Sequence, residues 1–148
     1  YFILVVIGLS PWYKPTYVIP IAGMIIGNSM TGVTLGVNTY MGEMSSRRNL
    51  VEGALMLGAT PKQATKNIAN RAFDSAMMPT INNMVGMGIV FLPGMMTGQI
   101  LGGASPLVSI EYQIAIMLGV AGAVSLSVII FVLFGYQAFF NERGQLVK

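Results

Sequence analysis

Uncharged apolar stretches alternate with one polar segment along the 148 residues of the chain. Three of the apolar stretches, residues 18–41, 80–101 and 110–134, hold at least 22 residues each and at most one charged side chain. An α-helix rises 1.5 Å per residue, so about 20 apolar residues cross the roughly 30 Å hydrocarbon core of a bilayer. The pattern therefore predicts three complete membrane-spanning helices.

A fourth apolar run, residues 1–10, is too short to span alone, because ten helical residues cover only about 15 Å. It has neither a basic leader nor a small-residue cleavage site, so it does not resemble a signal peptide. We interpret it as the end of a spanning helix. We therefore expect residues 1–148 to be the C-terminal part of a single transmembrane domain.

Composition supports a membrane environment for the whole chain. Apolar residues make up 54% and charged residues 9%, and the mean hydropathy is +0.70. Soluble domains carry about 25% charged residues, which they need to cover a surface that faces water. The predicted fold class is an all-α integral membrane protein, a polytopic helical bundle.

The polar segment, residues 43–78, is predicted to form an elbow between helices on the water side. Gly58 can end one helix, because glycine adopts the left-handed conformation without a Cβ clash. Thr60 is a suitable N-cap, Pro61 fits the first helical position, and Gln63 completes a capping box. The pattern predicts a short amphipathic helix over residues 61–69. It is either a solvated loop element or a docking helix for a soluble partner.

The basic residues predict the orientation in the membrane. Seven of the eight Lys and Arg side chains fall on one side of the predicted spans, and only Lys14 falls on the other. Cytoplasmic loops carry the excess of Lys and Arg. Residues 43–78 and the C-terminus are therefore expected in the cytoplasm, with the spans in the plasma (inner) membrane.

Two faces of the first complete span are notched by small residues. Gly32 and Gly36 lie nearly opposite a face that includes Gly23 and Gly27, and both pairs have the small-xxx-small spacing of close helix contacts. A helix with small residues on two opposite faces is predicted to pack against other helices on both faces, near the centre of a bundle.

Several polar or flexible positions inside the spans are candidates for a transport pathway. An amide is costly in lipid, so Asn28, Asn38 and Asn82 must face protein or water. For the asparagines, an interhelical hydrogen bond is the favoured alternative to a substrate contact. Pro93 and Gly94 predict a kink or break of the span, which either exposes backbone to a pathway or serves packing alone.

Three further side chains complete the candidate pathway. Met95 and Met96 follow the predicted break. Glu111 either stabilises the N-terminus of the last span, with Ser109 as its cap, or attracts cations at the outer mouth. Thioethers bind Cu(I) well and Fe(III) poorly, but most of the 12 methionines are expected to fill gaps between helices. A metal site is therefore left open.

The residues that are absent exclude most enzyme chemistry. The chain has no Cys and no His, and it lacks a phosphate-binding loop of the Gly-x4-Gly-Lys-Ser/Thr type. No nucleophile–base pair can be assembled, so we predict no catalytic residue and no cofactor in this chain. The net charge of +3 lies beside membrane spans and does not indicate a nucleic-acid partner.

Part of the polar segment resembles a known family of membrane proteins. Glu52-Gly53-Ala54, Gly58 and Pro79 are similar to the Glu-Ala-Ala loop of ABC-transporter membrane subunits, although Gly53 stands where that pattern has Ala. In those subunits the loop holds a coupling helix that seats in the nucleotide-binding subunit. The resemblance implies a partner-binding segment made of Glu52, Gly58, Ala59, Thr60, Pro61, Lys62 and Gln63.

A wider resemblance runs from about Pro20 to the C-terminus. Residues 20–30, 57–64, 92–100 and 145–147 are similar to the FetB-type permeases, a family linked to iron export and to plant aluminium tolerance. It implies the permease subunit of an ABC transporter for metal (iron) export, driven by a separate ATPase that binds ATP and Mg. A second permease copy is the other implied partner. An importer permease and a non-transport scaffold or receptor subunit are the alternatives.

Overall fold

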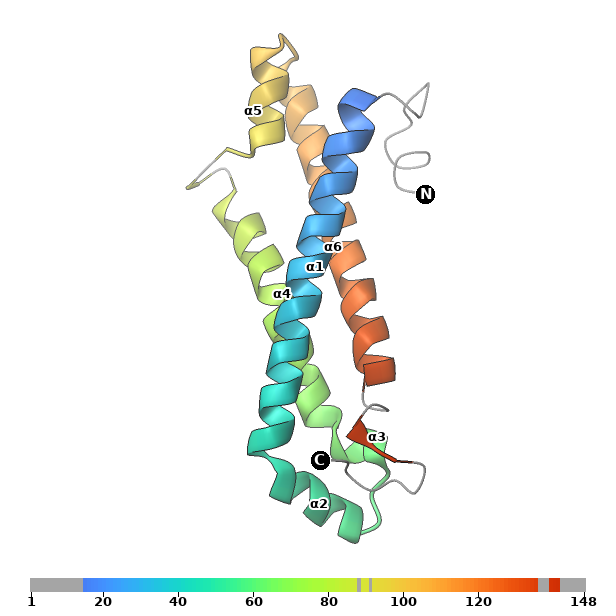
Figure 1. Ribbon diagram of the computed structural model, residues 1–148. Coiled ribbons are helices and arrows are strands. Elements are labelled where there is room, and N and C mark those ends of the chain that lie inside the picture. The colour runs from blue at the N-terminus through green and yellow to red at the C-terminus, as the bar shows by residue number, and fades with distance from the viewer. Residues whose placement is uncertain (1–14, 88, 91, 136–138, 142–148) are drawn as a thin grey trace.

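The structure is a computed structural model, and it describes residues 15–87, 89–90, 92–135 and 139–141. Within them six α-helices carry the fold (Figure 1). Residues 1–10, Lys14, Arg143 and Lys148, which entered the sequence predictions, lie outside the described residues. The helices are α1 (Pro15–Ser46), α2 (Arg48–Met56), α3 (Pro61–Ala64), α4 (Lys66–Gly86), α5 (Gly94–Leu101) and α6 (Pro106–Gly135).

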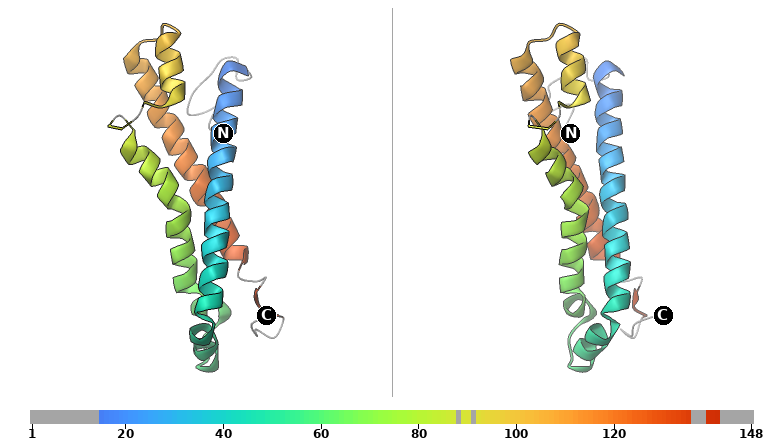
Figure 2. Two further views of the ribbon diagram at one scale, coloured as in Figure 1. Left: turned by 60° about the vertical axis from the view of Figure 1, so that its left-hand side comes forward. Right: turned by 90° about the vertical axis from the view of Figure 1, so that its left-hand side faces the viewer.

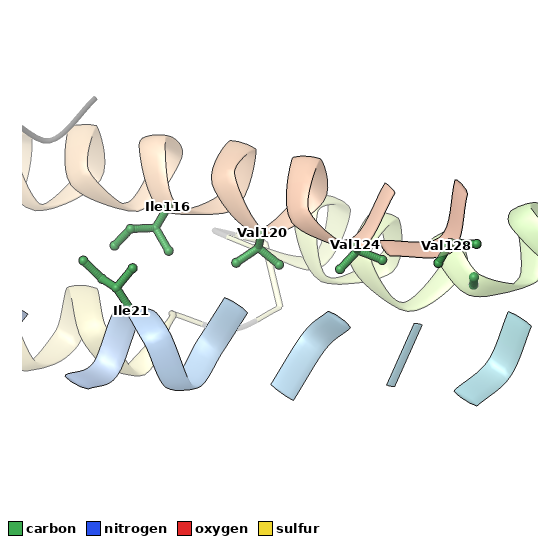
Figure 3. Close-up of a cluster of buried hydrophobic side chains, with 6 residues drawn as sticks. Ile21, Ile116, Val120, Val124 and Val128 are labelled. Carbon is green, nitrogen blue, oxygen red and sulfur yellow. The ribbon is translucent and has the colours of Figure 1, made fainter. Parts of the chain in front are cut away.

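Three long helices, α1, α4 and α6, run along one another and form the bundle (Figure 1, Figure 2). The buried face of α6 recurs every three or four residues, which is the helical period. From this face Ile116, Val120, Val124 and Val128 point into the space beside α1, where Ile21 joins them (Figure 3). All five side chains are at most 2% exposed. The core is therefore a single apolar seam along the bundle axis.

The closest approach within this seam is made possible by two glycines of α1. A Cβ atom on Gly32 would lie 2.7 Å from Val124 Cγ1 and 3.3 Å from the Ala76 carbonyl oxygen. A Cβ atom on Gly36 would lie 3.4 Å from the Ala76 Cβ. This face therefore packs as predicted.

The opposite notched face of α1 is open among the described residues. No described atom comes within 4 Å of a Cβ built on Gly23 or on Gly27. The predicted packing on this second side stays a prediction.

The outer surface of the bundle is apolar, as a lipid-facing surface must be. Residues Val18–Ser46 and Pro106–Gly135 are long and apolar enough to cross a membrane, with only 11% and 22% of their most apolar windows buried. Leu118, Leu126 and Phe134 of α6 are each more than 60% exposed. Monomeric soluble proteins rarely expose so much contiguous apolar surface. The protein is an all-α membrane protein.

The predicted span over residues 80–101 is divided between two helices. Helix α4 begins at Lys66, passes through Pro79 and ends at Gly86, and α5 follows only at Gly94. One proline removes one backbone hydrogen bond, and the packing of α4 continues across it because Ala76 and Thr80 are both buried. The break predicted near Pro93 is confirmed, since α4 and α5 are separate helices.

One predicted helix end and one predicted helix start also need correction. The helix that begins at Pro61 ends at Ala64 instead of continuing to residue 69, because the chain turns at Thr65 before α4. Helix α6 begins at Pro106, so Ser109 is inside it, fully buried, and donates a hydrogen bond to the Ser105 carbonyl oxygen at 3.1 Å. Ser109 is therefore no N-cap. Glu111 is exposed in the second turn and does not occupy the N2 position.

The tight contact at Gly32 predicts a difference between two equivalent substitutions. Gly32→Ala should destabilise the bundle, because overpacking a close contact costs about 1–3 kcal/mol. Gly27→Ala is the matched control, and it should be neutral or stabilising by up to about 1 kcal/mol through helix propensity. Thermal unfolding of both purified proteins in detergent measures the difference. Equal midpoints would contradict the close approach at Gly32.

Candidate functional site

The elbow between α2 and α3 begins with a helix end that requires glycine. Gly58 has φ +91°, a conformation that L side chains rarely adopt. The Gly58 amide donates to the Leu55 carbonyl oxygen and the Ala59 amide donates to the Ala54 carbonyl oxygen, both at 3.0 Å. These two bonds form a Schellman motif. The predicted role of Gly58 in ending the helix is therefore confirmed.

A complete capping box starts the next helix. The Gln63 amide donates to Thr60 Oγ1 at 3.4 Å, and the Thr60 amide donates to Gln63 Oε1 at 3.0 Å. Thr60 has an extended backbone and Pro61 occupies the first helical position, as predicted. The side chains of Lys62 and Gln63 are exposed, whereas Ala59 is half-buried. Two adjacent local motifs thus fix the turn of the elbow.

An apolar cluster joins the elbow to all three long helices. Its buried members are Tyr40 and Met44 of α1, Val51 of α2, and Ile68 and Ala72 of α4. Phe131 of α6 packs against it, with its ring centroid 6.4 Å from that of Tyr40 in an edge-to-face arrangement. We call this group the elbow cluster. Helix α2 is therefore packed against the adjacent ends of the bundle.

Ion pairs reinforce the same end of the bundle. Glu43 of α1 pairs with Arg47 Nε at 2.6 Å and with Arg71 Nη1 of α4 at 3.5 Å. Glu52, a predicted partner-binding residue, is 38% exposed and pairs with Arg48 Nε at 2.7 Å within α2. The Glu43–Arg71 pair connects the exit of α1 to the first turns of α4.

The side of the elbow that faces away from the bundle is apolar. Leu50 is 68% exposed, Met56 86% and Leu57 91%. All five Lys and Arg residues in the described part of the chain lie in or next to the elbow, which is drawn at the lower end of Figure 1. Large apolar side chains exposed beside a cluster of charged residues are typical of a protein docking surface. We call these three residues the elbow patch.

A pocket lies at the other end of the seam, beside the break between α4 and α5. In the left view of Figure 2, the C-terminal half of α4 leans away from α1. The pocket has a volume of about 230 Å³. Its lining residues come from α1, α4, α5 and α6 and from the break itself: Met24, Asn28, Thr80, Asn83, Met87, Pro93, Gly94, Gln113, Met117 and Val120.

Gln113 is the residue that distinguishes this pocket from a packing defect. It is 3% exposed, yet neither Nε2 nor Oε1 of its amide has a hydrogen-bond partner among the described residues. Gln113 also lines a second hollow of about 360 Å³, which shares Met87 and Pro93 with the first and adds Met84 and Met96. A buried unpaired amide costs about 1–3 kcal/mol, so Gln113 is the polar group in this wall that most needs a hydrogen-bond partner.

The structure divides the predicted pathway residues into two groups. Asn28, Pro93 and Gly94 line the Gln113 pocket, and Met96 lines the second hollow. Asn28 Nδ2 also donates to the Met24 carbonyl oxygen at 2.7 Å, which is an intrahelical bond instead of the interhelical one considered.

The remaining pathway candidates lie outside both hollows. Met95 packs against the apolar seam, and Asn38, Asn82 and Glu111 are exposed.

Sequence reasoning missed the amide at the centre of this pocket. Gln113 lies in an apolar stretch of the last span, where the rule applied to the asparagines also marks a polar side chain as costly. Thr80, Asn83 and Met87 fall within the predicted span over residues 80–101 but were not among the candidate pathway residues. No local pattern shows that Met24 and Met117, from two different helices, line one pocket.

The chain matches the uncharacterised protein family UPF0014 over residues 1–140. It belongs to that family. This UPF0014 chain is similar to the protein ALUMINUM SENSITIVE 3 of Arabidopsis thaliana, with 41% identity over 98% of the chain and 53% of the relative. It is also similar to the UPF0014 membrane protein STAR2 of Oryza sativa subsp. japonica, with 41% identity over 97% of the chain and 50% of the relative.

A bacterial relative carries a more specific name. The chain is 41% identical to the probable iron export permease protein FetB of Escherichia coli K12, over 91% of the chain and 52% of the relative. The resemblance to FetB-type permeases is therefore confirmed. The chain spans about half the length of these curated relatives. No solved structure matches it.

The unpaired amide predicts an unusual stability effect in this UPF0014 protein. Gln113→Leu should raise the free energy of unfolding by about 1–3 kcal/mol, because the buried, unsatisfied amide is replaced by an apolar side chain of similar size. Ser109→Ala is the control, since the hydroxyl of Ser109 is already bonded within its own helix. Thermal unfolding in detergent measures both. A lower unfolding midpoint for Gln113→Leu would show that the amide is paired.

Proposed function

We propose that this chain is part of the permease subunit of an ABC transporter, in which the elbow docks a separate ATPase subunit. The main support for this proposal is the elbow itself. It has an exposed apolar patch on one side and packs against all three long helices on the other. The name of the E. coli relative, an iron export permease, supports transport. ATP and Mg would bind in the partner, because this chain has no phosphate-binding loop.

The structure suggests a path for the motion. The ATPase would press on the elbow patch, and the Schellman motif and capping box would hold the turn rigid. The elbow cluster would pass the displacement to Tyr40 of α1, Ala72 of α4 and Phe131 of α6. The far ends of these helices line the Gln113 pocket, so this pocket is the proposed binding site along the pathway.

The cargo and assembly are also part of this proposal. We infer metal export from the printed name of the E. coli relative, with a second permease copy completing the transporter. The open face of Gly23 and Gly27 supports a helix contact outside the described chain. An importer would share this architecture. A scaffold or receptor subunit would need the elbow but not an unpaired amide inside the bundle.

The orientation can be tested without background, because the chain has no cysteine. Lys62→Cys at the elbow should stay unlabelled by an impermeant maleimide in whole cells and react after permeabilisation. Ser105→Cys, in the exposed α5–α6 loop at the opposite end, should react in whole cells. The expectation rests on the excess of Lys and Arg at the elbow. Labelling at Lys62 but not at Ser105 would invert the topology.

Two alanine substitutions test coupling through the elbow. Gly58→Ala places a side chain at φ +91°, which costs about 1–2 kcal/mol and should distort the turn. Gly53→Ala is the matched control, because its helical site has no described atom within 4 Å of a new Cβ. In proteoliposomes with the ATPase, Gly58→Ala should lower transport per ATP hydrolysed, and Gly53→Ala should not. Equal coupling in both would show that the elbow is only a solvated turn.

A charge on the elbow patch tests docking separately from the turn. Leu57 is 91% exposed, so Leu57→Glu should leave the fold unchanged and weaken co-purification of the ATPase. Leu118→Glu, on the lipid-facing side of α6, should instead impair membrane insertion. Full retention of the ATPase by Leu57→Glu would overturn the proposed docking surface.

A further inference from the structure

We propose that the Gln113 pocket binds a soft, singly charged metal ion, Cu(I) or its redox-inert analogue Ag(I). This inference rests on the proposed function, because it assigns a substrate class to the pocket along the transport pathway. It differs from the metal in the name of the E. coli relative, and it follows from the side chains that line the pocket.

The methionines of the chain are concentrated around this pocket. Met24 of α1, Met87 at the end of α4 and Met117 of α6 line it, and Met84 and Met96 line the adjoining hollow. Five of the 12 methionines thus surround one region that is built from four helices. Three of them, Met24, Met87 and Met117, line the same pocket from different segments of the chain.

Gap filling is not the whole role of these three side chains, although Met24 also packs against the apolar seam. Methionine usually occupies irregular spaces between helices, because its side chain is flexible. Here all three methionines line a volume of about 230 Å³. The same wall carries the unpaired amide of Gln113, which an apolar filling would leave unsatisfied. The pocket therefore combines sulfur-bearing side chains with an amide that has no partner among the described residues.

The ligand set favours a soft ion of low charge. None of the pocket's lining residues is Asp, Glu, His, Lys or Arg, and the described residues contain no cluster of acidic or imidazole ligands. Hard ions such as Fe(III) need anionic oxygen ligands, whereas thioethers select Cu(I). Moving an ion out of water costs more as its charge increases, so an uncharged pocket accepts a monovalent ion at the lowest cost.

Gln113 supplies the remaining donor. Its amide oxygen is unpaired and lies in the same wall, and glutamine is an accepted weak axial ligand in copper sites. Asn83 and Thr80 line the same pocket and can accept the hydrogen bonds of the Gln113 Nε2 group once the side chain is oriented by the ion. The site would thus combine three thioether sulfurs with one amide oxygen.

Ag(I) titration of the purified protein tests the proposal. Isothermal titration calorimetry in detergent and nitrate buffer, without the ATPase, should show one high-affinity Ag(I) per chain. Met87→Leu and Met117→Leu should each weaken this affinity by about 10- to 100-fold. Met30→Leu and Met78→Leu are the matched controls, because both side chains are more than half exposed on the outer surface. Leucine conserves the volume of methionine, so all four proteins should stay folded.

Binding and transport fail in different ways in this design. Absence of Ag(I) binding, or equal loss in the pocket and control variants, would overturn the site and leave the transporter proposal standing. Loss of ATPase docking with intact Ag(I) binding would overturn the transporter proposal and leave the metal site standing. X-ray absorption of the Cu(I)-loaded protein should show a sulfur-dominated first shell with an oxygen contribution that Gln113→Leu removes. A shell of oxygen and nitrogen alone would also overturn the site.

Discussion

The contact of Gly32 and Gly36 with α4 and α6 is the constraint on which the rest of the bundle depends. Because Gly32 and Gly36 carry no side chain, α1 lies close enough for Ala76 and Val124 to contact its backbone. In a membrane no hydrophobic driving force pulls helices together, so such close packing has to supply much of the association energy. Because the helices meet here, they can diverge beyond this point towards the pocket and still form one structure.

One stripe of α1 connects the functional regions. Met24 and Asn28 line the pocket, Gly32 and Gly36 make the close contact, and Tyr40 and Met44 belong to the elbow cluster. These positions recur every four residues, so they occupy one slowly turning face of a single helix. The buried positions of α4 run in the opposite direction, from Ile68 in the elbow cluster to Thr80 at the pocket. The pocket and the elbow are thus opposite ends of the same helix interfaces.

Local chemistry determined which parts could be predicted from sequence. The elbow was predictable because Gly58, Thr60 and Gln63 act on their immediate neighbours, and the bonds they form need no tertiary information. The extent of α4 was not, because a single proline weakens a helix less than packing against α1 stabilises it. The pocket was beyond sequence reasoning for a different reason. Gln113 stands out as a polar residue in an apolar span, but its lack of a partner depends on what three other segments place around it.

The position of the glycine contact along α1 has a mechanical consequence. Gly32 lies eight residues from Met24 and eight from Tyr40, about 12 Å along the axis in each direction. If α1 tilts as a rigid body about Gly32, Met24 and Tyr40 move in opposite directions by equal amounts, because they are equally far from it. When the elbow end of α1 moves towards α4, the other end moves away from it by the same amount. Closure at one end of the bundle and opening at the other are then one movement, and no separate hinge is needed to alternate them.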